Sequence, residues 1–156
     1  MQIVGGAVII SALLSAMHLL TLALGLGGIV FRGRALAQIL DEAGWRRLLA
    51  ADNAWGAAAV LWIATGLGRV FFGGKESAFY SHNGLFWTKM ALFALVFALE
   101  LTPMITFIRV RSALRNHTPL PQFSVKLYRR INSAEVVLIV MIVFTASFMA
   151  RGVWMF

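Results

Sequence analysis

The residues of this chain best suited to chemistry are three ionisable side chains set in long apolar stretches, His18, Lys89 and Glu100. The spacing of Lys89 and Glu100 is close to three full helical turns, so a helix places both on one face. A charge in the middle of a membrane helix costs about 2.5 to 3.5 kcal/mol, and such residues usually face partners inside a bundle. Lys89 and Glu100 are therefore expected either to form interhelical ion pairs or to bind a ligand and handle protons.

His18 is expected to share a helical face with Ser11, Ser15 and Gly25, which are small enough to let a helix or a flat ligand approach. It either bonds a neighbouring helix or ligates a metal. The chain has no cysteine, which excludes thiolate metal sites and covalently attached haem. A haem held between His18 and His82 is disfavoured, because His82 lies at the boundary of the apolar region. The different depths of the two histidines therefore favour ligation of a haem iron by His18 alone.

Other charged residues stand at the ends of the apolar stretches. Arg69 and Arg151 either extend to lipid headgroups or contact the acidic groups of a ligand. Asp52 and Glu135 are expected at helix starts, where a carboxylate complements the helix dipole. The sequence contains no recognisable nucleophile triad, carboxylate dyad or metal-ligand motif.

The elements that must position these residues are membrane helices. Hydrophobic residues make up 60% of the 156 residues and charged residues only 13%, whereas a soluble domain has about 25% charged residues. The net charge of +8 is therefore interpreted from where the Lys and Arg residues lie relative to the membrane, and not as a sign of nucleic-acid binding. A spanning helix needs about 20 apolar residues. The sequence predicts an all-α, integral membrane four-helix bundle, forming one transmembrane domain over 1–156, with spans at about 3–31, 54–72, 85–108 and 134–156.

The basic residues predict the orientation, because short cytoplasmic loops retain Lys and Arg. The first loop, 32–51, and the third, 109–132, hold ten of the fourteen Lys and Arg residues, whereas the second loop holds only Lys75. Both termini are therefore expected outside. In the first loop, Leu36, Ile39 and Leu40 fall on one helical face, which predicts an interfacial amphipathic helix.

Three stretches resemble a family of small bacterial four-helix membrane proteins of unknown function. They are Met17-His18-Leu19, the segment from Ala64-Thr65-Gly66 through Phe86-Trp87-Thr88-Lys89, and Met149-Ala150-Arg151-Gly152. This resemblance covers the whole chain and implies a multi-pass protein of the bacterial inner (cytoplasmic) membrane.

The chain is also similar, more distantly, to the HemJ-type protoporphyrinogen oxidases, membrane proteins of haem synthesis. The similarity rests on His18 with Gly28 and Arg34, on Trp87 with Lys89, and on Arg129, Asn132 and Glu135. It implies a porphyrin site built on His18 and Lys89. Glu100 stands where that family usually has a second histidine, so the resemblance favours retained porphyrin binding over a retained oxidase reaction.

Together these observations predict a membrane protein that binds a b-type haem or porphyrin and has a redox role. His18 would ligate the iron, Lys89, Arg69 and Arg151 would meet the propionates, and Glu100 would exchange protons. The alternative is a non-catalytic accessory subunit of a larger membrane complex, or a homo-oligomer, whose small-residue faces dock onto other helices. A transporter is the third possibility. It is disfavoured, because the chain is small and lacks broken helices in corresponding halves. Whether the protein is an enzyme is left open.

Overall fold

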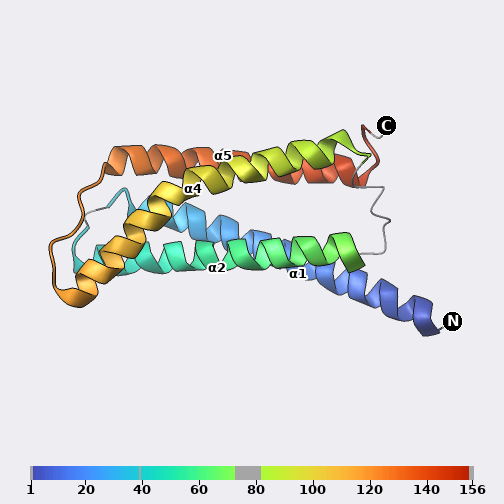
Figure 1. Ribbon diagram of the computed structural model, residues 1–156, viewed down its shortest axis with the longest axis horizontal. Coiled ribbons are helices and arrows are strands. Elements are labelled where there is room, and N and C mark those ends of the chain that lie inside the picture. Colours follow the sequence, from blue (N-terminus) through green and yellow to red (C-terminus); the bar gives the residue numbers. More distant parts are fainter. Residues whose placement is uncertain (1, 39, 73–81, 155–156) are drawn as a thin grey trace.

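The computed structural model describes residues 2–38, 40–72 and 82–154, and this part of the chain is helical without strands. Four helices run roughly along one axis (Figure 1). They are α1 (Gln2–Ala35), α2 (Glu42–Phe72), α4 (Gly84–Asn116) and α5 (Val125–Ala150). The prediction of an all-α four-helix bundle is confirmed.

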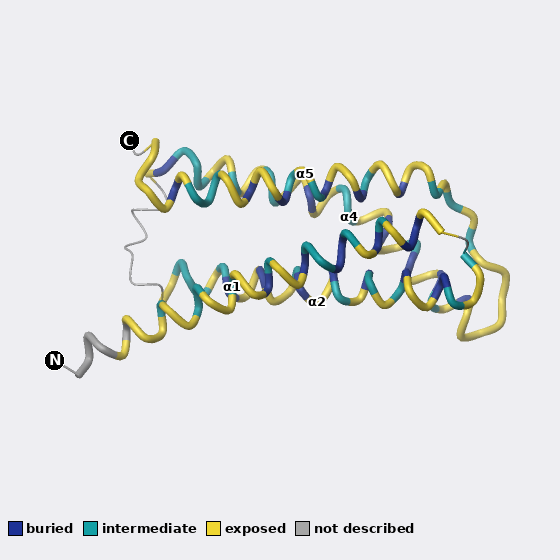
Figure 2. Tube along the Cα trace, turned by 180° about the vertical axis from the view of Figure 1, so that it is seen from behind, coloured by how far each residue is buried: buried dark blue, intermediate teal, exposed yellow. Residues whose placement is uncertain are grey.

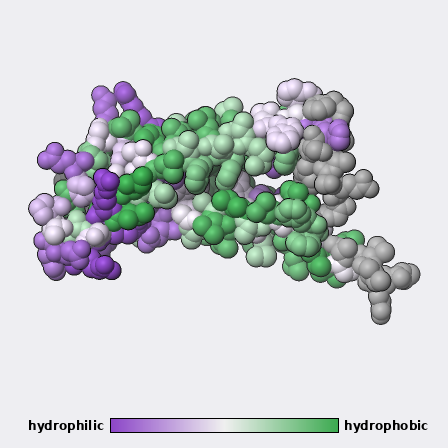
Figure 3. All heavy atoms as spheres, viewed as in Figure 1, coloured by the Kyte–Doolittle hydropathy of each residue, from purple (hydrophilic) through white to green (hydrophobic). Residues whose placement is uncertain are grey.

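All four helices are long and apolar enough to cross a membrane. At about 1.5 Å per residue, even the 26 residues of α5 exceed the roughly 30 Å of a hydrocarbon core. No more than 22% of any of these apolar stretches is buried inside the chain, which leaves the rest for contact with lipid. Hydrophilic residues gather at the end that carries the α1–α2 turn and the α4–α5 connection (Figure 3). The molecule is thus a multi-pass membrane protein with one strongly polar end.

The helices form two pairs, α1 with α2 and α4 with α5, and the α1–α5 contact joins the pairs. Glycines on α1 allow the first pair to pack closely. A Cβ atom on Gly28 would lie 2.9 Å from the backbone nitrogen of Trp55, and one on Gly25 would lie 3.3 Å from the Trp55 ring. The small-residue face predicted around Gly25 therefore packs on the chain's own α2.

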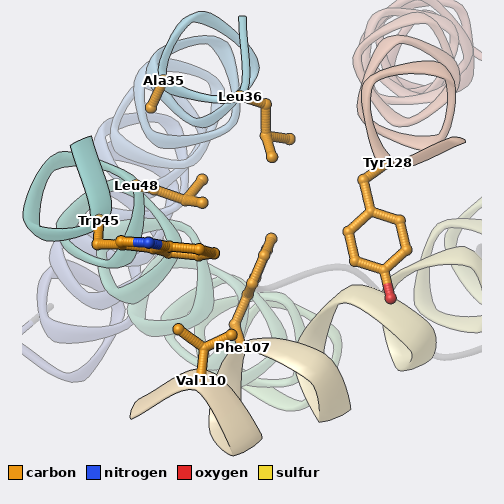
Figure 4. Packing of buried hydrophobic residues seen from close by; sticks show 7 residues of the cluster. All are labelled: Ala35, Leu36, Trp45, Leu48, Phe107, Val110 and Tyr128. Atoms are coloured by element: carbon orange, nitrogen blue, oxygen red, sulfur yellow. The ribbon is translucent and has the colours of Figure 1, made fainter. Parts of the chain in front are cut away.

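The polar end also holds a hydrophobic cluster to which all four helices contribute. Phe107 of α4 packs edge to face against Tyr128 of α5, with ring centroids 5.8 Å apart. Figure 4 shows the Phe107 ring between Tyr128 on one side and Trp45 and Leu48 of α2 on the other. Ala35 of α1 belongs to the same cluster. Along the tube of Figure 2, buried segments alternate with exposed ones on each helix. The two pairs are thus packed together most fully at the polar end.

Helix α4 lies beside α5 over its first half and then bends toward α2 (Figure 1). Pro103 lies inside α4 and is buried, and a proline removes one backbone hydrogen bond from a helix. The Tyr128 hydroxyl lies 2.6 Å from Thr106 Oγ1 and 3.4 Å from the carbonyl oxygen of Thr102. A tyrosine from α5 therefore bonds α4 on the residues beside Pro103, where the helix bends.

The predicted interfacial helix in the first loop is wrong. Helix α1 continues to Ala35, the described residues of 36–41 form turns, and α2 begins at Glu42. Leu36 is buried in the hydrophobic cluster instead of facing lipid. The Asp41 side chain accepts a hydrogen bond of 2.6 Å from the Gly44 nitrogen, so it caps α2 and fixes its start. The predicted spans 3–31, 54–72 and 85–108 lie within α1, α2 and α4, which extend beyond them, and α5 ends at Ala150 whereas the fourth predicted span continues to 156. Lys75 and Ile39 lie outside the described residues.

The orientation is tested by single cysteines in this cysteine-free chain. We expect an impermeant thiol reagent added to intact cells to label Ser77→Cys and to leave Gln38→Cys and Gln122→Cys unlabelled, because basic loops stay in the cytoplasm. All three variants should label after permeabilisation, which serves as the control. Labelling of Gln38→Cys and Gln122→Cys alone in intact cells would show that the orientation is inverted.

Candidate functional site

A completely buried arginine lies where the two helix pairs meet. Arg32 of α1 is 1% exposed and bonds side chains from each of the other three helices. Its Nη2 donates to Glu135 Oε2 at 2.6 Å, and its Nη1 donates to Glu100 Oε1 at 2.7 Å. Nη1 also lies 3.1 Å from Asp52 Oδ1, and Nε donates to Asn132 Oδ1 at 3.0 Å. We call Arg32, Asp52, Glu100, Asn132 and Glu135 the Arg32 network.

Sequence reasoning missed this role, because it placed Arg32 in the first cytoplasmic loop. The structure corrects that assignment: α1 extends to Ala35, so Arg32 lies on a helix and inside the bundle. Gly33 makes room for the network, since a Cβ there would lie 2.6 Å from Asn132 Nδ2. The signal that could have identified Arg32 is the set of three acidic residues, Asp52, Glu100 and Glu135, that the order of the spans places toward the same end of the bundle as Arg32. Asp52 and Glu135, expected merely to begin helices, are two of these carboxylates.

The Arg32 network carries more negative than positive charge. Arg111 adds a second guanidinium, 2.5 Å from Asp52 Oδ2, so three carboxylates face two cations and one negative charge is left over when all are ionised. Glu100 Oε2 and Glu135 Oε1 are buried and have no hydrogen-bond partner among the described residues. A proton on one of these two glutamates would remove the excess charge and supply the missing donor.

A second polar cluster surrounds His18, which is half-buried. His18 Nδ1 lies 2.9 Å from Thr65 Oγ1. The Thr65 hydroxyl also lies 2.7 Å from the Leu61 carbonyl oxygen and 3.2 Å from that of Trp62, so its single proton is directed to the backbone. Thr65 must then accept from His18 Nδ1–H. This tautomer leaves Nε2 with a free lone pair, and Nε2 has no hydrogen-bond partner in the described part of the chain.

The surroundings of His18 combine an aromatic wall, a gap and a polar donor. The His18 and Trp62 ring centroids are 5.7 Å apart, and Trp62 in turn meets Phe93 of α4 at 6.1 Å. A Cβ on Gly66 would lie 3.5 Å from His18 Cε1, so glycine leaves space beside the imidazole. Trp62 Nε1 is buried and lacks an acceptor among the described residues.

Two of the predicted cationic residues lie in the same region. Arg69 and Lys89 lie within electrostatic range of His18, and Arg69 lies within the same range of Lys89. Lys89 is half-buried, with its Nζ 5.4 Å from the Phe86 ring centroid. The structure therefore brings His18, Lys89 and Arg69 together in what we call the His18 cluster.

The remaining predicted site residues lie elsewhere. Glu100 belongs to the Arg32 network. Arg151 is exposed just past the end of α5, where its Nη1 donates to the carbonyl oxygen of Ser147 at 3.0 Å. His82 is exposed, before the start of α4. No group of three or more His, Asp or Glu side chains suited to a metal ion occurs among residues 2–38, 40–72 and 82–154.

The sequence matches a protein-family model over nearly the whole chain. No curated protein and no solved structure matches the sequence. Residues 10–154 match a family described as "Predicted membrane protein (DUF2214)", so the match includes the Arg32 network and the His18 cluster. This chain belongs to the DUF2214 family of predicted membrane proteins.

Proposed function

We propose that this protein binds a b-type haem or a related porphyrin at the His18 cluster, in the cytoplasmic membrane of a bacterium, and has a redox role. The observation that carries the proposal is the Thr65 hydrogen bond, which fixes the His18 tautomer with Nε2 unprotonated and without a partner among the described residues. A neutral imidazole whose second nitrogen is held by a hydrogen bond is the usual form of a histidine ligand.

The other groups of the cluster fit the rest of such a ligand. Lys89 and Arg69 supply positive charge for the propionate carboxylates of a porphyrin. Trp62 Nε1 supplies a buried donor that lacks an acceptor among the described residues, and Gly66 leaves space beside the imidazole. In Figure 3 the molecule is hollowed between the two helix pairs, in the half away from the hydrophilic end.

The chain's own residues would divide the work. His18 would ligate the iron of a haem, Thr65 would hold the imidazole ring, and Lys89 with Arg69 would bind the acidic groups of the porphyrin. A bound haem would supply one-electron chemistry. Glu100 does not fit a role at this ligand, because its Oε1 is 2.7 Å from Arg32 in the other cluster. Arg151 bonds Ser147 on its own helix and is not needed for the proposal.

Absorption spectroscopy of the purified protein tests the proposal. Protein from haem-replete cells should show a Soret band that shifts on reduction, and His18→Ala should abolish the band, because it removes the side chain that would ligate the iron. Lys89→Met should weaken porphyrin retention while the helical circular dichroism is unchanged, and Lys89→Arg should be milder, because it keeps the charge.

His82→Ala is the matched control, because it removes an exposed histidine outside the His18 cluster and should leave the spectrum unchanged. A colourless wild-type preparation that stays unchanged after incubation with haem or protoporphyrin would refute the proposal. So would a Soret band that survives in His18→Ala.

A further inference from the structure

A groove runs between α1 and α2 near the polar end of the molecule, on the surface that the bilayer covers. Its volume is about 710 Å³, within the range of about 300 to 1,000 Å³ that is usual for small-molecule sites. Small and apolar residues form its walls, among them Gly27 and Phe31 on α1 and Ala50 and Ala54 on α2. The groove is thus an apolar channel on the lipid-facing surface, along the part of α1 that crosses the membrane.

Two arginines lie at the polar end of this groove, Arg34 from α1 and Arg47 from α2. Both are exposed, and neither forms an ion pair with a described residue. Their neighbours behave differently, since Arg32 binds carboxylates inside the bundle and Arg46 pairs with Glu42. The Arg34 guanidinium lies over the Phe31 ring, 5.7 Å from its centroid, which holds it beside the groove.

We propose that the groove binds an anionic phospholipid, with an acyl chain along the α1–α2 wall and the phosphate between Arg34 and Arg47. The complementarity is twofold. The apolar wall lies at the depth of the hydrocarbon chains, and the unpaired guanidinium groups lie at the end of the span, where headgroups are found. Guanidinium groups bind phosphate oxygens through two parallel hydrogen bonds. In a zwitterionic choline headgroup, the positive charge of the choline weakens the attraction of the phosphate to these arginines. The basic loops place this site in the cytoplasmic leaflet.

The wall of the groove provides a variant that should block the acyl chain without disturbing the fold. A Cβ on Gly27 would meet nothing within 4 Å, so a leucine there has room to extend into the groove. Gly56 on α2 is equally open and does not line the groove, so Gly56→Leu is the matched control. Gly28 is unsuitable, because any side chain there would collide with the backbone of α2.

Native mass spectrometry of the full chain, titrated with dioleoylphosphatidylglycerol or dioleoylphosphatidylcholine, tests the proposal. Wild-type protein should retain phosphatidylglycerol preferentially. The double variant Arg34→Gln/Arg47→Gln should weaken the binding of phosphatidylglycerol about 10- to 30-fold. Each basic residue near the membrane surface contributes about 1 kcal/mol, and two such contributions correspond to a change of this size. Arg109→Gln/Arg115→Gln removes the same charge from exposed positions on α4 and should have little effect. Gly27→Leu should lower retention of the lipid, and Gly56→Leu should not.

Three results would overturn the proposal. Equal retention of the two lipids would show that the arginines do not select an anionic headgroup. An equal loss in Arg109→Gln/Arg115→Gln would show diffuse attraction to basic charge rather than a site. Unchanged binding in Gly27→Leu, or competition by glycerol phosphate as effective as by the lipid, would show that the groove does not hold the acyl chain.

Discussion

Arg32→Met is expected to lower the free energy of unfolding by about 3 to 5 kcal/mol, the usual cost of removing one partner from a buried ion pair. Methionine keeps an unbranched apolar side chain in place of the arginine stem but leaves Glu135, Glu100 and Asn132 without their common donor. Arg32→Lys should recover only part of the loss, because one ammonium group cannot reproduce the planar array of donors. Unfolding by sodium dodecyl sulfate, followed by circular dichroism in mild detergent, measures the effect.

Two further variants show whether the loss belongs to the Arg32 network. Arg34→Met removes an exposed arginine two residues away and should change the stability by no more than about 0.5 kcal/mol. Glu135→Gln should be tolerated far better than Arg32→Met, because its amide still accepts from Arg32 and adds a donor where the network carries excess negative charge. If Arg32→Met were as stable as Arg34→Met, the network would not hold the two helix pairs together.

Gly28→Ala is expected to be less stable than Gly27→Ala by about 1 to 3 kcal/mol, the usual cost of overpacking. The new Cβ would lie 2.9 Å from the Trp55 nitrogen and 3.3 Å from the Ala51 carbonyl oxygen. Both are backbone atoms of α2, which cannot rotate away, so α1 and α2 would have to separate. The same detergent titration measures the difference.

Gly27→Ala is the matched control, since it stands on the same helix and its Cβ meets nothing within 4 Å. Alanine favours a helix over glycine by about 1 kcal/mol at either position, so the difference between the variants isolates the steric cost. Equal stabilities would contradict the close α1–α2 packing that the structure shows.

The number and class of the helices could be predicted from the sequence, because a spanning helix must be apolar over about 20 residues and four such runs exist. The ends were harder to predict. Hydropathy marks only the part of a helix that lipid covers, and α2 continues twelve residues further toward the polar end than its predicted start at 54. The first loop was mistaken for an amphipathic helix, because the apolar face around Leu36 looks the same whether it meets lipid or a protein core.

In the candidate sites, too, some residues could be predicted from the sequence and others could not. His18 and Lys89 could be singled out because a polar group inside an apolar run is conspicuous, and the structure places both in one cluster. Arg32 could not, since an arginine at the end of an apolar run usually extends to the headgroups. Its burial depends on carboxylates from three other helices, 20 to 103 residues away along the chain. Such a pairing follows from the packing of the helices and leaves no local pattern.

The Arg32 network also sets an order of assembly in the membrane. Asp52 of α2 can neutralise Arg32 as soon as the first two helices pair, so the amino-terminal hairpin enters the bilayer with its own counter-ion. Glu100 and Glu135 arrive only with the third and fourth helices. Until then the guanidinium lacks most of its hydrogen-bond partners, and in a chain truncated before α5 the Nε and Nη2 groups of Arg32 have no Asn132 or Glu135 to accept their hydrogen bonds. All the hydrogen bonds of the Arg32 network can therefore form only after α5 has been inserted beside the other three helices.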